Sequence, residues 1–240
     1  MYPRIFDGMM LFRFILGLIL LSSLLNSKVV KGVDLQPNKT YKNVDLKGAN
    51  LSGMNLSGTV FLTSDLRGVK LNGANLSNSI LRRCNFKRAN FIGTNLENTQ
   101  LDYSDLTKAV IKSANLHGSS FKKVKFDLAT IEKSDARKAD FEGARFAKTH
   151  INGVDARKSN FSKTVLYELN IINSKFWGSD FRFIVLKDVV FKDSGLEDVI
   201  FNKESVIKNI SFENTRWTDK ELCEEKGFSY CLNEGISIYN

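Results

Sequence analysis

The 240-residue sequence is poor in proline, and both prolines lie near its start. Pro3 and Pro37 precede residue 44, and no proline follows them. Proline cannot donate a backbone hydrogen bond, so it interrupts the ladder between strands. The rest of the chain is therefore compatible with a body whose backbone is hydrogen-bonded throughout.

Histidine is equally scarce, which limits the chemistry that the chain can perform. His117 and His150 are the only two, and neither lies in a spacing typical of metal ligands. Asp135, Asp140 and Asp155 recur at one fixed position of a repeat described below. The sequence contains no phosphate-binding loop, nucleophile motif or Cys–His arrangement. We therefore expect no catalytic residue, no metal and no cofactor, and we predict that the protein is not an enzyme.

The three cysteines fall into two groups. Cys84 lies inside the repeat and is expected to be a small buried filler. Cys223 and Cys231 lie together near the C-terminus, where they could form a disulfide in an oxidising compartment or remain free thiols in a reducing one. The pair therefore bears on where the protein is located.

The N-terminus resembles a targeting segment. Arg4 and Arg13 precede an uncharged apolar run over residues 14–25, whose length suits a signal peptide better than a bilayer span. Small or compact residues favour cleavage after Gly32, with Ser27 as a weaker site. We predict export to a periplasmic, lumenal or extracellular space. The alternatives are a membrane anchor formed by residues 9–25 and a buried helix leading into the repeat.

A five-residue period runs without a slip from Leu46 to Phe201. Of the 32 residues at its centres, 30 are Leu, Phe or Ile, and the other two are Ala136 and Ala156. First positions of the units are compact, and second positions favour Asn or Asp, as in Asp45. This period matches neither a helix nor an unbroken strand.

Within each unit, two inward residues flank a polar one, which is the pattern of a very short strand. Ten of the 16 glycines occupy the fifth position, where a tight turn requires positive φ. The chain is therefore predicted to make a short strand, turn a corner and repeat. If four units close a coil, 32 units make eight coils and a rod roughly 38 Å long.

Several units resemble those of the pentapeptide-repeat proteins, in which Ala is followed by Asp or Asn, then Leu or Phe, then two variable residues. Full matches occur at residues 49–53, 74–78, 114–118 and 139–143, and the resemblance covers residues 44–203. It implies an all-β fold, a right-handed quadrilateral parallel β-helix. Some members of the family imitate duplex DNA and protect topoisomerases.

A four-sided coil places every twentieth residue on the same face. One face then carries a nearly continuous ladder of phenylalanines that includes Phe121, Phe141 and Phe161. Ala136 and Ala156 lie opposite Phe126 and Phe146, so we expect the large rings to compensate for the two small centres rather than leave a ligand cavity.

Beyond Phe201 the period slips by one residue and continues through Ile207, Phe212 and Trp217. A capping-box pattern at residues 218–221 and Gly227 predict a short helix that closes the end of the stack. The alternative role of this end is a homodimer contact. The predicted boundaries are 1–32 for the signal peptide or signal anchor, 33–43 for a lead-in, 44–217 for the repeat, and 218–240 for the helical cap and tail.

One corner of the predicted rod is basic. Arg137 and Lys138 lie one coil away from Arg157 and Lys158, so four cations should stack there. Such a corner could bind a phosphate, an anionic lipid or an acidic protein. It could equally be a solvated corner that nearby carboxylates neutralise.

Three aromatic residues of one coil occupy outward turn positions, although at different corners. Exposed aromatics beside cations are typical of contact surfaces. The candidate contact residues are therefore Arg137, Lys138, Arg157, Lys158, Tyr167, Trp177 and Phe183.

These features predict an exported, non-enzymatic protein that offers a rigid binding or scaffold surface to a macromolecule. The expected partner is a protein of unknown identity. The net charge of +9 permits an anionic surface, and a membrane could be reached through the N-terminal segment. Nucleic acid is not expected. One alternative is a DNA mimic, which the basic charge and the export signal disfavour, and another is an enzyme or a binder of small anions.

Overall fold

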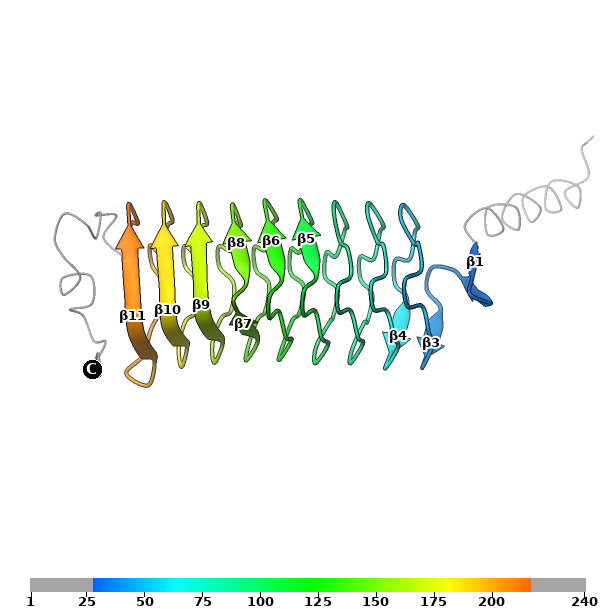
Figure 1. Cartoon of the computed structure of the whole chain (residues 1–240), viewed down its shortest axis with the longest axis horizontal. Coiled ribbons are helices and arrows are strands. Elements are labelled where there is room, and N and C mark those ends of the chain that lie inside the picture. The colour runs from blue at the N-terminus through cyan, green and yellow to red at the C-terminus, as the bar shows by residue number, and fades with distance from the viewer. Residues whose placement is uncertain (1–27, 217–240) are drawn as a thin grey trace, which may run out of the picture.

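A computed structural model describes residues 28–216 and shows a straight rod of stacked coils (Figure 1). The rod is an all-β parallel solenoid of about nine turns, which confirms the predicted fold class. Eight coils were predicted. The additional coil is formed at the two ends of the rod, where Tyr41 and the residues after Phe201 continue the stack. The predicted N-terminal helix, Trp217, the capping helix and the Cys223–Cys231 disulfide lie outside the described residues.

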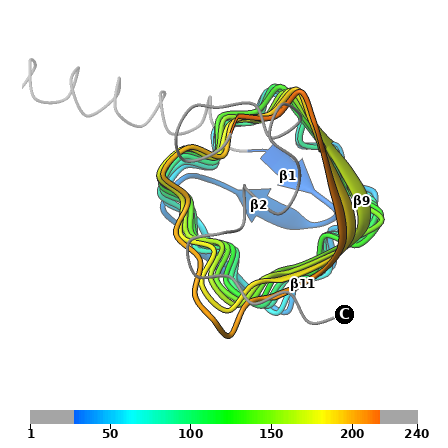
Figure 2. The same cartoon turned by 90° about the vertical axis from the view of Figure 1, so that its left-hand side faces the viewer.

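The register between coils is twenty residues. Asp45 pairs with Asp65, and the same spacing recurs through the stack as far as Asp180 and Ile200. Viewed along the rod, the coils superimpose as a four-sided outline (Figure 2). Four units therefore close each coil, as the resemblance to the pentapeptide-repeat proteins implies.

The predicted phase slip is present at the C-terminal end. Val185 pairs with Val206, twenty-one residues further on, and Gly195 pairs with Arg216 at the same spacing. The extra residue lies between Ile200 and Val206, where a turn occupies residues 203–204. In Figure 2 an orange loop projects beyond one corner of the outline.

The described strands are short at the N-terminal end of the rod and longer toward the other end. Three span eight residues: β9 (Val165–Ile172), β10 (Val185–Lys192) and β11 (Val206–Glu213). The others have three residues: β1 (Lys28–Val30), β2 (Val33–Leu35), β3 (Thr40–Lys42), β4 (Val60–Leu62), β5 (Val110–Lys112), β6 (Thr130–Glu132), β7 (Arg145–Ala147) and β8 (His150–Asn152).

Pairing of these strands is parallel except at the N-terminus. The largest sheet has the order β11-β10-β9-β8-β6-β5, with β7 also paired to β9, and β3 pairs with β4. Most other units contribute isolated bridges. Strands β4, β5, β9, β10 and β11 begin at valine in the second position, where a β-branched side chain favours extended backbone and offers no oxygen for a turn.

An antiparallel hairpin covers the N-terminal end of the stack. Strands β1 and β2 pair Lys28 with Leu35 and Val30 with Val33. Leu35 is fully buried, and Val30 and Val33 pack against the core. Figure 2 shows both strands crossing the outline of the coils. The repeat pattern does not extend into this segment, so the hairpin was not predicted.

The core consists of the repeat centres and the first positions. Every centre from Leu46 to Leu196 is buried. The phenylalanine ladder is confirmed, since the rings of Phe121 and Phe141 lie 5.2 Å apart and those of Phe141 and Phe161 lie 4.8 Å apart. A second stack joins Phe126 and Phe146 at 4.7 Å.

The rings opposite the two alanine centres fill only part of the volume that the small side chains leave. An apolar cavity of about 20 Å³ adjoins both Ala136 and Ala156, and Phe146 and Phe161 form part of its lining. Polar groups are absent from the lining, and cavities of this kind stay dry. The cavity therefore offers nothing to bind a polar ligand.

Side-chain oxygens at two repeat positions form hydrogen bonds with backbone carbonyl and amide groups. Buried hydroxyls at first positions donate to carbonyls of the preceding coil, as from Thr99 to Leu76 at 2.7 Å. At second positions the side chain accepts from the amide two residues later, as Asn95 does from Glu97 at 3.0 Å. These Asx turns explain the preference for Asn and Asp. Cys84 is buried as predicted, and burial raises the pKa of its thiol to about 11.

Every fifth position from Gly48 to Asp198 has positive φ, whether or not glycine occupies it. Ten of these residues are glycines, but lysines such as Lys138 and larger residues such as Phe183 adopt the same conformation. The stacking of coils therefore imposes the left-handed corner on side chains that rarely adopt it.

The first prediction concerns the aromatic ladder. Phe161 is buried and its ring contacts those of Phe141, Phe176 and Phe181. Phe161→Ala should lower the free energy of unfolding by about 3–5 kcal/mol in chemical denaturation. Phe183→Ala is the matched control, because that ring is 45% exposed at a corner and its loss should cost under about 0.5 kcal/mol. Equal losses would contradict the ladder.

The second prediction concerns the left-handed corner. At Gly68 φ is +62°, and an added Cβ would meet no atom within 4 Å. Gly68→Ala should therefore cost about 1 kcal/mol through backbone conformation alone. Gly68→Asn should cost less, since asparagine tolerates this region. Thermal unfolding of both variants measures the difference. A melting temperature of Gly68→Ala equal to that of the native protein would contradict backbone strain at this corner.

Candidate binding surface

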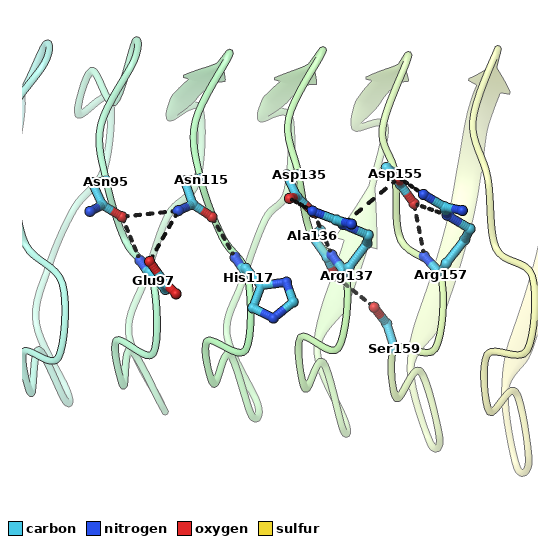
Figure 3. A network of polar contacts seen from close by, with 10 residues as sticks. All are labelled: Asn95, Glu97, Asn115, His117, Asp135, Ala136, Arg137, Asp155, Arg157 and Ser159. Carbon is cyan, nitrogen blue, oxygen red and sulfur yellow. Dashed lines mark hydrogen bonds and ion pairs between the residues drawn. The ribbon is translucent and has the colours of Figure 1, made fainter.

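Residues twenty apart form columns along the corners, and one column carries the predicted basic residues. Glu97, His117, Arg137 and Arg157 follow one another along this corner (Figure 3). Trp177 occupies the same position in the next coil, which its register with Arg157 requires. We call Arg137, Lys138, Arg157, Lys158 and Trp177 the arginine–tryptophan corner.

Each arginine of this corner is paired with the aspartate two residues before it. Arg137 donates from Nε to Asp135 Oδ1 at 2.9 Å and from a terminal nitrogen to Oδ2 at 2.6 Å. Arg157 contacts Asp155 in the same way at 2.8 and 2.7 Å. Arg137 Nε also lies 4.0 Å from Asp155, which links the two coils.

These contacts shift the ionisation of both partners toward the charged form. Hydrogen bonds from Arg137 lower the pKa of Asp135, and the same contact raises the pKa of Arg137. Burial alone would raise the pKa of Asp155, but hydrogen bonds from Arg157 outweigh it and the pKa is lowered. The arginines are thus neutralised and held in place, as the solvated-corner interpretation expects.

The lysines of the corner are not neutralised in this way. Lys138 and Lys158 are exposed, and neither has an ion-pair partner among residues 28–216. Trp177 is 48% exposed, and its indole nitrogen donates a hydrogen bond to Asp198 of the next coil. The corner therefore combines two lysines that have no ion-pair partner in the described part of the chain, two oriented guanidinium groups and a fixed aromatic ring.

The other predicted aromatics lie elsewhere, as their sequence positions require. Tyr167 is at a second corner, where Lys187 Nζ lies 5.1 Å from its ring centre. Phe183 is at a third corner and is 45% exposed. Of the three predicted aromatics, only Trp177 lies beside the basic residues. Its spacing of twenty residues from Arg157 would have predicted this position from the sequence.

A further exposed aromatic was missed from the sequence. Tyr103 is 54% exposed and lies between Arg83 and Lys123 of the neighbouring coils. The residue numbers again differ by twenty. A comparison of residues at that interval, rather than of neighbours along the chain, would have found it.

No candidate metal site is assembled in residues 28–216. That part of the chain holds no group of three or more His, Cys, Asp or Glu residues arranged to bind an ion. His150 Nε2 lies 3.4 Å from Glu132, and His117 Nδ1 is buried with no partner in the described region. Across residues 28–216 no helix has the length and apolarity to cross a bilayer.

The twenty-residue register and the outward corners define a four-sided parallel β-solenoid that displays side chains in columns. A model of the family described as pentapeptide repeats matches residues 45–83, 84–122 and 125–162, with eight copies. The chain belongs to the pentapeptide-repeat family.

Solved structures of similar proteins include several with repeats of this kind. HetL, a pentapeptide repeat protein involved in heterocyst differentiation regulation from the cyanobacterium Nostoc, is 19% identical, with 76% of this chain and 89% of HetL covered and a TM-score of 0.42. Full-length QnrB1, a plasmid-mediated fluoroquinolone resistance protein, is 18% identical, with 79% and 100% covered and a TM-score of 0.30. No curated protein matches the chain in sequence.

Proposed function

We propose that the chain is an exported, non-enzymatic protein whose rigid solenoid presents the arginine–tryptophan corner to a protein partner. The observation that carries this proposal is the continuation of the arginine column by Trp177, because tryptophan and arginine are the residues that dominate binding energy at protein interfaces. The Asp135 and Asp155 contacts hold the guanidinium groups in fixed orientations, which lowers the entropy lost on binding.

The chemistry of the corner favours an acidic partner. Lys138 and Lys158 supply unpaired positive charge, which steers association with a negatively charged surface. The ring of Trp177 would contribute apolar area at the end of this charged column. A DNA mimic needs acidic faces, so this corner gives no support to that alternative.

Crosslinking in the compartment where the protein resides tests the proposal. A photoreactive residue in place of Lys158 should capture a partner, whereas the same residue in place of Lys133, an exposed lysine at a different corner, should not. Trp177→Ala should abolish the capture, and Phe183→Ala, which removes another exposed ring, should leave it unchanged. Capture that is equal at both lysine positions, or that survives Trp177→Ala, would overturn the proposal.

Export makes a separate prediction about the mature N-terminus. Cleavage after Gly32 would remove β1, whereas cleavage after Ser27 keeps the hairpin that covers the N-terminal end of the core. The first residue of the mature protein, measured by intact mass, should therefore be Lys28. A chain beginning at Val33 would show that the hairpin is dispensable, and an intact chain in the cytosol would contradict export.

A further inference from the structure

One face of the rod carries a dense group of cations that does not include the arginine–tryptophan corner. It extends between the corner of Arg83 and the corner of Arg88 and continues over the next coils at the twenty-residue spacing. We call it the central basic face. Over residues 83–88, 103–108, 123–128 and 143–148 it holds eight cations and two carboxylates, a net charge of +6: Arg83, Lys87, Arg88, Lys108, Lys123, Lys125, Arg145 and Lys148, with Asp105 and Asp127.

Both carboxylates form ion pairs with cations of the same face. Lys87 Nζ lies 3.2 Å from Asp105, and Arg145 Nε lies 3.1 Å from Asp127. Lys148 Nζ lies 3.0 Å from Glu168 of the next coil. The other five cations are exposed, and none has a carboxylate within ion-pair distance among residues 28–216: Arg83, Arg88, Lys108, Lys123 and Lys125. These five charges lie on one side of three successive coils, at a spacing of about 4.8 Å along the rod.

Exposed side chains of partly apolar character border this face. Tyr103 is 54% exposed at one edge, and Leu128 is 47% exposed at the other. Arg83 Cζ and Lys123 Nζ lie 5.7 and 5.4 Å from the Tyr103 ring centre, one from the coil on each side. A cation from each neighbouring coil therefore flanks the ring, while the residue as a whole remains half exposed.

We propose that the central basic face docks on a membrane surface that contains anionic lipids. Five cations on one rigid side, all without ion-pair partners within residues 28–216, complement a layer of negatively charged headgroups, and each adds to the attraction. Tyrosine is typical of the interface between headgroups and acyl chains, where its ring and hydroxyl both find suitable surroundings. Single-stranded nucleic acid is the less suitable partner, because it binds by stacking bases on aromatic faces, and a cation from each neighbouring coil flanks the ring of Tyr103.

This surface is independent of the proposed protein-binding corner. The arginine–tryptophan corner adjoins two other faces of the four-sided coil, so a partner bound there would leave the central basic face open. Loss of lipid binding would therefore leave the crosslinking experiment at Lys158 unaffected.

Vesicle co-sedimentation of the full chain tests the proposal. Phosphatidylcholine vesicles that contain about a third phosphatidylserine should bind the protein at low salt and release it at high salt. Pure phosphatidylcholine vesicles should bind much less. The triple variant Arg83→Glu, Lys123→Glu, Lys125→Glu should bind the anionic vesicles about 100-fold more weakly.

A second triple variant controls for net charge. Lys70, Lys133 and Lys175 are exposed cations away from this face, and they too lack ion-pair partners in the described region. Lys70→Glu, Lys133→Glu, Lys175→Glu makes the same change in net charge and should retain most of the binding. An equal loss in both triple variants would overturn the proposal, as would equal binding of the native chain to neutral vesicles.

Two competition arms separate other sources of negative charge. Millimolar inorganic phosphate should displace little of the protein from the vesicles, because a single ion engages only part of the face. Tighter binding to single-stranded DNA than to the vesicles at matched salt would assign the face to nucleic acid, and full displacement by phosphate would assign it to a small anion. Either result overturns the membrane proposal.

Discussion

The backbone ladder between coils is the constraint on which the rest of the structure depends. Leu51 donates to the carbonyl of Lys70 at 2.8 Å, and Lys70 donates in return to that of Ala49 at 2.9 Å. Repetition of these contacts through the stack fixes the coil at twenty residues. It also holds each corner in the left-handed region, even where lysine or phenylalanine occupies it. The surface is consequently organised in columns, and side chains that are distant in sequence become neighbours.

The repeat explains why most of the fold could be predicted from sequence. Buried centres must be large and apolar, and the second position must supply an oxygen to the turn, so both requirements recur every five residues. The hairpin of β1 and β2 was not predicted, because a single hairpin has no period to reveal it. The cavity beside Ala136 and Ala156 was not predicted either. The opposing rings fill part of the volume that the small alanine side chains leave, and how much they fill depends on side-chain geometry that the sequence does not show.

The candidate surfaces were predicted less completely than the fold, for a related reason. The five-residue period does not constrain which residue occupies an exposed position. The sequence around Trp177 therefore shows an aromatic residue near other aromatics, but it does not show which residues of other coils lie beside it. Its place in the arginine column follows from the coil length, and so does the position of Tyr103 between Arg83 and Lys123. Sequence reasoning found the basic corner because two Arg-Lys pairs mark it directly, and it missed residues that become adjacent only through the register.

The position of a cation within its unit decides how much of its charge reaches a partner. Arginine in the fourth position meets the aspartate in the second position of the same unit, as in Arg67 with Asp65 and Arg182 with Asp180. Cations in the fifth position are turned away from that carboxylate, and several have no ion-pair partner in residues 28–216, Lys138 and Lys158 among them. The net charge of the chain is therefore a poor guide to its contacts. Seven fifth-position cations lack an ion-pair partner in residues 28–216, and the twenty-residue register determines which of them act together: Arg83, Arg88, Lys108, Lys123, Lys133, Lys138 and Lys158.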